Sequence, residues 1–371
     1  METDILLKNG NKSHNSYLSP PITYKNNDLA SDTIDTVILS GGGYLGILYF
    51  GLIKLLDTEN MYHGIKRVYG VSVGSIFALL IILKYSYADA MLLLETEFDV
   101  SKFITINTKD IFNLTETFGL SEPTYIEQSV KTILEKAGLS PYVTMEDLYN
   151  HTGIEFNLGV TLALQNKYVL INHITRPDLP VWLAIRMSAN LPIIFNPVRD
   201  TIFNDLVYDG GHLNNNPIKH YLDSAYTYKK PVVCDAYTQT EEINENDCEI
   251  ETVVLKPCNK PSSKKYRMNF ICIDLKINRM QSVLGACDLD TVSLMDYLLA
   301  IISKFTYNQD SYKAEYKPYM LSIDCSQFPE LAQIPFTASN QKIKEICEQG
   351  FCMINDYYRG LMINTADDIT E

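Results

Sequence analysis

A serine between two glycines has the surroundings that most favour catalysis in this sequence. Residues 70–74 read Gly-Val-Ser-Val-Gly, with Ser72 at the centre, an apolar strand-like segment before it and an apolar helix-like segment after it. A serine hydroxyl is a weak nucleophile until a neighbouring base takes its proton. A sharp turn from strand to helix presents that hydroxyl only when small residues flank it, and Gly70 and Gly74 meet this requirement. The pattern predicts a nucleophilic serine, although Gly-x-Ser-x-Gly also arises by chance.

A run of three glycines, Gly41, Gly42 and Gly43, forms an earlier turn of the same strand–turn–helix kind. Acyl transfer builds negative charge on a carbonyl oxygen, and N–H donors must already point at the place where that charge develops. Glycines allow this close approach at the N-terminus of the following helix. A phosphate-binding loop is the rival interpretation, but the run lacks the Walker lysine and the Rossmann order of glycines. Together with Ser72, the run predicts an oxyanion hole.

The base that would activate the serine is harder to identify. Six histidines are present, and none sits where a Ser…Asp…His order would make it convincing, although His212 and His220 follow Asp209. Asp209 ends a strand-like segment and is followed by Gly210 and Gly211. Asp-Gly is also a common turn pair. Spacing alone therefore leaves two interpretations of Asp209 open, a general base and an ordinary turn residue.

The rest of the chain shows helical and strand patterns that could position these turns. Apolar residues at helical spacing predict helices over residues 88–98, 124–137, 144–149, 181–187, 217–222, 292–305 and 340–358. Alternating or continuous apolar segments predict a β-hairpin over 155–172 and strands at 202–203, 206–208, 270–275 and 320–323. Thr144 and Asn216 are expected to cap the helices that follow them.

Length and charge narrow the class of protein. The 371 residues suffice for one large α/β domain or two ordinary ones, and 46% hydrophobic residues indicate a globular chain. A net charge of −14 repels phosphate backbones, so we expect no nucleic-acid partner, and it opposes strong attraction to anionic bilayers. All eight cysteines follow residue 230 without a Cys-x-x-Cys pair, so we expect reduced cytosolic thiols and no disulfide framework or metal site.

Local composition predicts one domain with a loose start and an insertion. We expect a flexible arm over residues 1–30, a core over 31–225 and a C-terminal part of the same domain over 226–371, with a polar insertion at about 236–265. The first residues lack the pattern of a secretory signal. The uncharged run over 68–83 is shorter than the ~20 residues that span a bilayer. We therefore expect a cytoplasmic protein that could bind membranes peripherally.

Four sequence blocks, in this order, resemble those of the patatin-like phospholipase family. They read GGGYLG from Gly41, GVSVGS from Gly70, SANLPIIF from Ser188 and DGGHLNNNPI from Asp209. The resemblance covers about residues 36–222. Four ordered blocks make a more specific signal than any one of them alone.

The resemblance implies a fold and a set of site residues. The fold is an α/β architecture in three layers, α/β/α, with a central, mostly parallel sheet flanked by helices. Ser72 would be the nucleophile and Asp209 its general base, a dyad that needs no histidine. The oxyanion hole would be formed by Gly41, Gly42 and Gly43. The supporting residues would be Gly70 and Gly74 at the serine, Gly210 and Gly211 beside Asp209, and Ser188 and Pro192 in the third block.

The resemblance also implies a substrate class. The family hydrolyses acyl esters of phospholipids and other lipids through an acyl-enzyme, without a metal or another cofactor. We therefore expect phospholipase A-like or lysophospholipase-like activity on acyl lipids at a transient membrane surface, with the oligomeric state left open.

One position departs from the family pattern and keeps alternatives open. The family usually has Arg or Lys two residues after the third glycine, where this chain has Leu45. Acyl-ester hydrolysis is therefore a firmer expectation than a phospholipid substrate. The main alternative is a catalytically weak or inactive lipid-binding or scaffold protein of the same fold. A third interpretation is an ordinary hydrolase triad with His212 or His220 as the base.

Overall fold

The computed structural model describes six stretches of the chain and a few single positions. The stretches are residues 34–99, 118–121, 123–227, 269–276, 319–324 and 339–366, and the single positions are 102, 316, 328 and 331. Three predictions lie outside the described residues: the flexible arm over 1–30, the polar insertion at 236–265 and the helix over 292–305.

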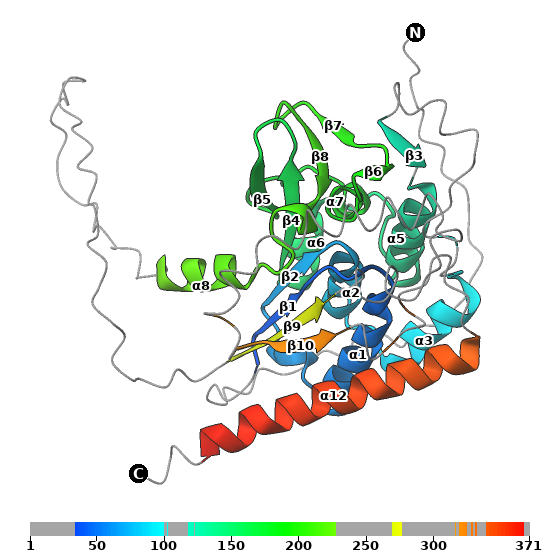
Figure 1. Ribbon diagram of the computed structural model, residues 1–371, viewed down its shortest axis with the longest axis vertical. Coiled ribbons are helices and arrows are strands. Elements are labelled where there is room, and N and C mark those ends of the chain that lie inside the picture. Colours follow the sequence, from blue (N-terminus) through cyan, green and yellow to red (C-terminus); the bar gives the residue numbers. More distant parts are fainter. Residues whose placement is uncertain are drawn as a thin grey trace, which may run out of the picture.

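A mixed sheet, with eight strands in the described part of the chain, forms the centre of the molecule (Figure 1). Five strands run parallel in the order β10 (Leu321–Asp324), β9 (Phe270–Lys276), β1 (Thr36–Leu39), β2 (Arg67–Val71) and β4 (Glu155–Leu162). Three antiparallel strands complete it: β5 (Lys167–Ile171) and β8 (Asp205–Asp209) pair with β4, and β7 (Val198–Asp200) pairs with β8. The predicted hairpin over 155–172 is therefore β4 and β5. A separate two-stranded ribbon joins β3 (Gly119–Ser121) to β6 (Ile193–Phe195).

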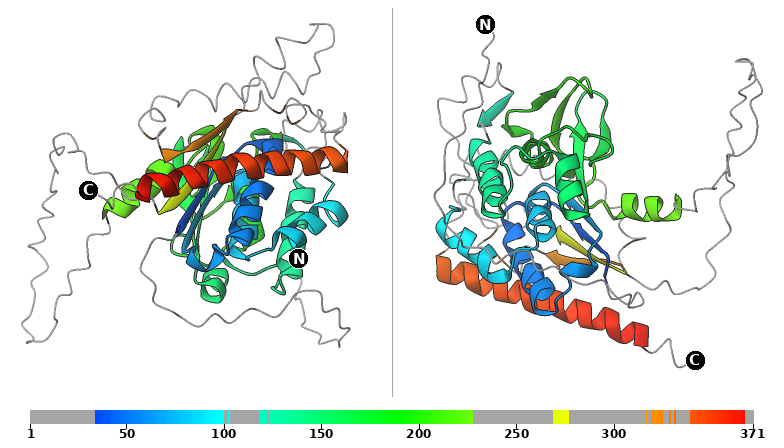
Figure 2. Two further views of the ribbon diagram at one scale, coloured as in Figure 1. Left: turned by 90° about the horizontal axis from the view of Figure 1, so that it is seen from below. Right: turned by 180° about the vertical axis from the view of Figure 1, so that it is seen from behind.

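Helices cover both faces of the sheet (Figures 1 and 2). The described α-helices are α1 (Tyr49–Thr58), α2 (Val73–Ile82), α3 (Tyr87–Thr96), α5 (Thr124–Lys136), α6 (Met145–Thr152), α7 (Val181–Ser188), α8 (Ile218–Thr227) and α12 (Asn340–Ala366). Three short 3₁₀ helices are η1 (Gly43–Leu48), η2 (Tyr62–Gly64) and η5 (Gly210–His212). Across these described ranges, every helix is too short or too polar to span a bilayer.

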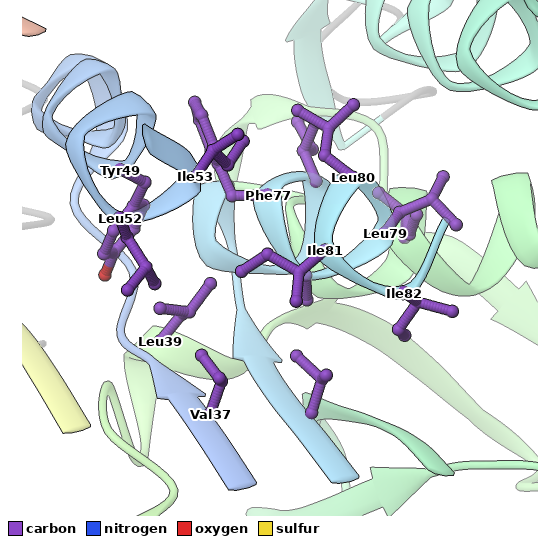
Figure 3. Packing of buried hydrophobic residues seen from close by; sticks show 14 of the residues in the cluster. Val37, Leu39, Tyr49, Leu52, Ile53, Phe77, Leu79, Leu80, Ile81 and Ile82 are labelled. Atoms are coloured by element: carbon purple, nitrogen blue, oxygen red, sulfur yellow. The ribbon is translucent and has the colours of Figure 1, made fainter. Parts of the chain in front are cut away.

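The two faces of the sheet carry separate apolar clusters. Val37 and Leu39 of β1 belong to the cluster that packs against α1 and α2 (Figure 3). Ile38, between them, belongs to the cluster on the other face, with Ile218 and Tyr221 of α8. Successive side chains of a strand point to opposite faces, so a continuously apolar strand needs cover on both sides. This arrangement confirms the predicted three-layer α/β fold.

The C-terminal helix α12 lies along α1, far from it in sequence (Figures 1 and 2). Each of the two helices has a glycine at the place where they meet. A Cβ atom at Gly51 would collide with the backbone of Phe351, and one at Gly350 would lie 2.7 Å from the carbonyl oxygen of Leu48. The absence of side chains at the crossing allows this close backbone approach. Lys54 of α1 and Glu348 of α12 form an ion pair beside it, with a nitrogen–oxygen distance of 2.6 Å.

Two predicted helix caps are confirmed and one predicted strand is wrong. The Thr144 hydroxyl accepts a hydrogen bond from the Asp147 N–H at 3.1 Å, and the Asn216 side chain accepts one from the Ile218 N–H at 3.1 Å. The strand predicted at 202–203 is instead the turn between β7 and β8. The Asp200 carboxylate accepts hydrogen bonds from the N–H groups of the two residues there, at 3.0 and 2.7 Å, and this local bonding replaces strand pairing.

Candidate active site

The two residues of the predicted dyad meet because their strands approach one another along β4. Val71, the last residue of β2, pairs with Gly159, and Asp209, the last residue of β8, pairs with the next residue, Val160. β2 runs parallel to β4 and β8 runs antiparallel to it, so the two strands end at neighbouring positions. Ser72 follows directly after Val71. The sheet therefore brings together two residues that are distant in the sequence.

Ser72 forms a tight elbow between β2 and α2. Its backbone has φ of 54° and ψ of −129°, a conformation that L-residues rarely adopt and that often occurs at functional sites. Its carbonyl oxygen accepts hydrogen bonds from the N–H and the hydroxyl of Ser75, at 2.9 and 2.5 Å. A Cβ atom at Gly70 would lie 2.7 Å from the Cα of Ser75, and one at Gly74 would lie 2.6 Å from the carbonyl oxygen of Ser40. Both glycines are therefore required by the packing of the elbow.

Ser188 connects the elbow to β4. The Ser72 N–H donates to the Ser188 hydroxyl at 3.1 Å, and that hydroxyl donates to the carbonyl oxygen of Gly159 at 2.8 Å. Ser188 is fully buried at the end of α7. Its hydroxyl thus holds the backbone of Ser72 in place. The sequence assigned Ser188 to a structural block, and only the structure reveals this contact.

Asp209 is a buried carboxylate whose two oxygens differ in their hydrogen bonding. Its side chain is 2% exposed, and its Oδ1 accepts a hydrogen bond from the Gly211 N–H at 2.7 Å. Oδ2 is buried and has no hydrogen-bond partner of ordinary geometry among the described residues. Burial raises the pKa of Asp209 to about 6, although the nearby Ser72 hydroxyl and the Gly211 N–H both lower it. A carboxylate with such a pKa can accept a proton near neutral pH.

The three glycines of the first turn differ in what their N–H groups do. The Gly41 N–H donates to the carbonyl oxygen of Asn215 at 3.2 Å. The N–H groups of Gly42 and Gly43 have no acceptor within the described part of the chain, and Gly43, with φ of 55°, begins η1. A Cβ atom at Gly41 would lie 2.9 Å from the Cβ of Ser72. The loop therefore touches the serine and leaves two N–H donors available.

Asn215, which no sequence motif singled out, links the glycine loop to the loop of Asp209. Its side-chain N–H donates to the carbonyl oxygen of Gly41 at 3.1 Å. A Cβ atom added at Gly211 would lie 2.8 Å from the Oδ1 of Asn215. A clue was present in the three asparagines that follow the Asp-Gly-Gly turn, because an amide can donate and accept at once.

A cavity of about 120 Å³ lies beside Ser72. One wall is a face of α2 formed by Val73, Ile76, Phe77 and Leu80. Side chains of η1, α1, α3, α5 and the segment after α7 form the rest, and most are apolar. Gly43 also borders the cavity. Ser72 and Gly43 thus border an apolar space, and the buried Asp209 carboxylate lies next to Ser72, outside the lining of the cavity.

The histidines considered as alternative bases lie in other surroundings. His212 packs against the ring of Tyr208, with ring centroids 5.1 Å apart, and burial lowers its pKa. The Nδ1 of His220 lies 3.2 Å from the side-chain nitrogen of Asn214, and its ring packs against Tyr168. Neither histidine lines the cavity. The described residues contain no group of three or more His, Cys, Asp or Glu side chains that could hold a metal ion.

Leu45, where the family pattern has a cation, is part of the apolar core. Its side chain is 2% exposed and belongs to the cluster that includes α1 and α2. Its N–H donates to the carbonyl oxygen of Gly42 at 3.1 Å. The glycine loop is thus held by Asn215 and by local backbone bonds, without a charged side chain at this position.

Comparisons with known proteins identify the family of the chain. Residues 37–222 match the family model described as patatin-like phospholipase. An uncharacterised protein of Acanthamoeba polyphaga mimivirus is 29% identical over 198 residues, which are 53% of this chain and 64% of that protein. A probable lipid hydrolase of Invertebrate iridescent virus 6 is 26% identical over 185 residues, which are 49% of this chain and 61% of that protein. This chain thus spans less than two thirds of the length of these two curated relatives.

A comparison with solved structures adds a remote match. The crystal structure of VipD from Legionella pneumophila aligns with 87% of this chain and 67% of its own, at 15% sequence identity and a TM-score of 0.42. That similarity is too low to support an argument. The family model, by contrast, covers half of the chain and contains all four sequence blocks. The chain belongs to the patatin-like phospholipase family.

Proposed function

We propose that this protein is a serine acyl hydrolase that releases fatty acids from lipid esters, with Ser72 as nucleophile and Asp209 as general base. The observation that carries the proposal is the strained Ser72 beside the buried Asp209 carboxylate, at one end of an apolar cavity. Family membership and a relative named as a probable lipid hydrolase support the same reaction class.

In the first half-reaction, Asp209 takes the proton of the Ser72 hydroxyl as the oxygen attacks the ester carbonyl carbon. The carbonyl oxygen becomes an oxyanion, and the N–H groups of Gly42 and Gly43 donate to it. We assign Gly41 a different part, because its N–H is already bonded to Asn215. The tetrahedral intermediate collapses, the alcohol leaves with the proton from Asp209, and the acyl group stays on Ser72.

In the second half-reaction, water attacks the carbonyl carbon of the acyl-enzyme. Asp209 accepts a proton from that water, and the same N–H donors hold the oxyanion. Collapse of the intermediate releases the fatty acid, and Ser72 regains its proton from Asp209. The cycle needs no histidine.

The substrate is proposed from the chemistry of the cavity and of the surface. An apolar cavity next to the nucleophile suits an acyl chain. Leu45 offers no positive charge to a phosphate, so an acyl ester is better supported than a phospholipid head group and a phospholipase A specificity. We further propose a cytoplasmic protein that meets its lipid at a membrane surface. The net charge of −14 disfavours nucleic acid.

The alternative of an inactive lipid-binding or scaffold protein rests on Leu45 alone. Leu45 is a buried residue of the apolar core. The dyad, the N–H donors and the cavity do not depend on a cation there. We therefore keep hydrolysis as the proposed function.

Purified protein tested against a panel of phospholipids, neutral acylglycerols and simple acyl esters tests this proposal, with Ser72→Ala as the control. We expect hydrolysis of at least one acyl ester by the wild type, covalent labelling of it by a serine-directed phosphonate, and loss of both in Ser72→Ala with unchanged thermal unfolding. Turnover by the mutant equal to that of the wild type would rule out Ser72 as the nucleophile.

A further inference from the structure

Ser129 is a buried hydroxyl in an otherwise apolar part of the cavity wall. It lies on α5, is 3% exposed and lines the cavity beside Ser72. Its Oγ has no hydrogen-bond partner among the described residues. A serine within a helix commonly bonds the carbonyl oxygen one turn earlier, and a buried hydroxyl without a partner destabilises the fold. The position therefore has an unused hydrogen-bonding group within the wall of a space suited to a ligand.

Two contacts fix the depth of Ser129 along the cavity. Glu127, two residues before it, forms an ion pair with Arg186 near the end of α7, where Ser188 bonds to Ser72. The carbonyl oxygen of Ile133, one turn after it, accepts a hydrogen bond from Tyr85 just beyond the far end of α2, at 2.7 Å. α5 thus runs alongside α2, from the Ser72 end toward the far end. Ser129 lies between these two points, partway along the cavity.

The length of the cavity can be estimated from α2. Its lining residues extend from Val73 to Leu80, and Ser72 precedes them, so eight residues at 1.5 Å each give a depth of about 12 Å. An extended chain advances about 3.6 Å for every three bonds, so the same depth takes roughly ten bonds. An acyl chain of this length, bound to Ser72, would pass Ser129 near its middle.

We propose that the cavity selects acyl chains that carry an oxygen, as a hydroxyl or a carbonyl group, near mid-chain, and that Ser129 hydrogen-bonds to that oxygen. The proposal rests on the acyl hydrolysis proposed above, and it adds the substrate class of oxygenated fatty acyl esters. An apolar chain would leave the Ser129 hydroxyl unpaired, whereas an oxygenated one would pair it. This difference in pairing is the source of the selectivity.

The test uses the full chain and two readouts. The first is calorimetric binding of free acids to the Ser72→Ala protein, and the second is turnover of the matching p-nitrophenyl esters by the wild type. The acids are a saturated chain of about ten carbons and versions with a hydroxyl or a keto group moved stepwise along it. We expect one mid-chain position to bind and react roughly 3- to 10-fold better than the plain chain.

Ser129→Ala is expected to remove that preference and to bind the plain chain more tightly, because the wall becomes fully apolar. Ile126→Val, one turn earlier on the same wall, is the matched control, and it should weaken both ligands while keeping their ratio. A preference for the hydroxyl, the ketone or both supports the proposal. Equal binding of plain and oxygenated chains at every position, or a preference that survives Ser129→Ala, overturns it. Binding preference without turnover would contradict the proposed catalysis alone, and turnover without preference would contradict the role of Ser129 alone.

Discussion

The two glycine turns follow neighbouring parallel strands, yet they present different groups to the site. β1 and β2 are in register, with Leu39 opposite Gly70, and each leads into a helix. After β2, Ser72 alone separates the strand from α2, so the chain turns sharply and the serine takes φ of 54°. After β1, three residues and a 3₁₀ helix make a wider turn, where two backbone N–H groups have no acceptor among the described residues.

This difference suggests a division of labour between side chain and backbone. The tight elbow is suited to fixing one hydroxyl, and it is held by local bonds to Ser75 and by Ser188. The wide loop is suited to presenting N–H donors, and it is held from outside by Asn215 and by the Leu275 N–H, which donates to the Ser40 hydroxyl at 2.8 Å. Substitutions in the two turns should therefore impair catalysis in different ways.

The largest effect is expected from the carboxylate that serves the elbow. Asp209→Asn keeps the size of the side chain and an acceptor for the Gly211 N–H, but it cannot take the proton of Ser72. We expect kcat for ester hydrolysis to fall by about 10³-fold, the middle of the range for a general base. Ester turnover measured on the folded variant checks this expectation. A loss of less than about threefold would mean that another group is the base.

The wide turn can be tested through its backbone. Gly43→Ala adds a methyl group at φ of 55°, where L-residues are strained, and shifts the N–H beside the cavity. We expect kcat to fall by about 10²-fold, as for loss of an oxyanion donor, with phosphonate labelling of Ser72 slowed as well.

Gly360→Ala on α12 is the matched control for that substitution, since a Cβ atom there meets nothing within 4 Å. It should leave kcat unchanged and raise the free energy of unfolding by about 0.5–1 kcal/mol through helix propensity. Equal kcat values for the two alanine variants would mean that the glycine loop takes no part in the chemistry.

The pH dependence sharpens the assignment of the base. Because burial raises the pKa of Asp209 to about 6, kcat/KM should fall about tenfold per pH unit below that value as the carboxylate is protonated.

The free energy of unfolding should change in the opposite direction and rise as the pH falls. The folded carboxyl binds its proton more tightly than the unfolded one, so protonation stabilises the fold below the unfolded pKa of 3.8, and this stabilisation is lost as the pH rises through about 6.

Asp209→Asn removes the cost of burying that charge. At pH 8 it should raise the free energy of unfolding by up to about 3 kcal/mol, with a smaller gain at pH 5. Chemical denaturation at the two pH values measures the difference. A destabilised variant at pH 8 would mean that the ionised carboxylate is well satisfied in the fold.

The smallest effect is expected at the support of the elbow. Ser188→Ala removes the acceptor of the Ser72 N–H but leaves the nucleophile and the base in place. We expect kcat to fall by roughly tenfold and the free energy of unfolding to fall by about 1–3 kcal/mol, the cost of a buried unpaired donor. Unchanged kinetics in a destabilised variant would mean that Ser188 stabilises the fold and does not contribute to catalysis.

The sequence predicted the parts of this site that depend on neighbouring residues. The glycines around Ser72 and the Asp-Gly-Gly turn at Asp209 are local patterns, and they were visible without a structure. The apolar strands and the capped helix at Thr144 were predicted for the same reason. The wrong strand at 202–203 arose because the side chain of Asp200 bonds to the backbone there, a local competition that apolar pattern does not reveal.

The contacts that complete the site join residues far apart in the chain. The bond from Ser72 to Ser188 spans 116 positions, and the bond from Asn215 to Gly41 spans 174. The apolar stripe of α5 predicted only that the helix is buried, and not that Ser129 would lie in a cavity wall without a hydrogen-bond partner among the residues that the structure describes. Such features depend on how the helices pack, which sequence periodicity does not specify.

The acyl-enzyme itself provides the most direct test of the proposed mechanism. Wild-type protein is mixed with an activated acyl ester, quenched with acid within the first turnovers and digested, and the acylated peptide is located by mass spectrometry. The account predicts one acyl group on Ser72, and its accumulation should be lost in Ser72→Ala and strongly slowed in Asp209→Asn. Hydrolysis that continues with no adduct on Ser72, or an adduct on a different residue, would contradict the proposed mechanism.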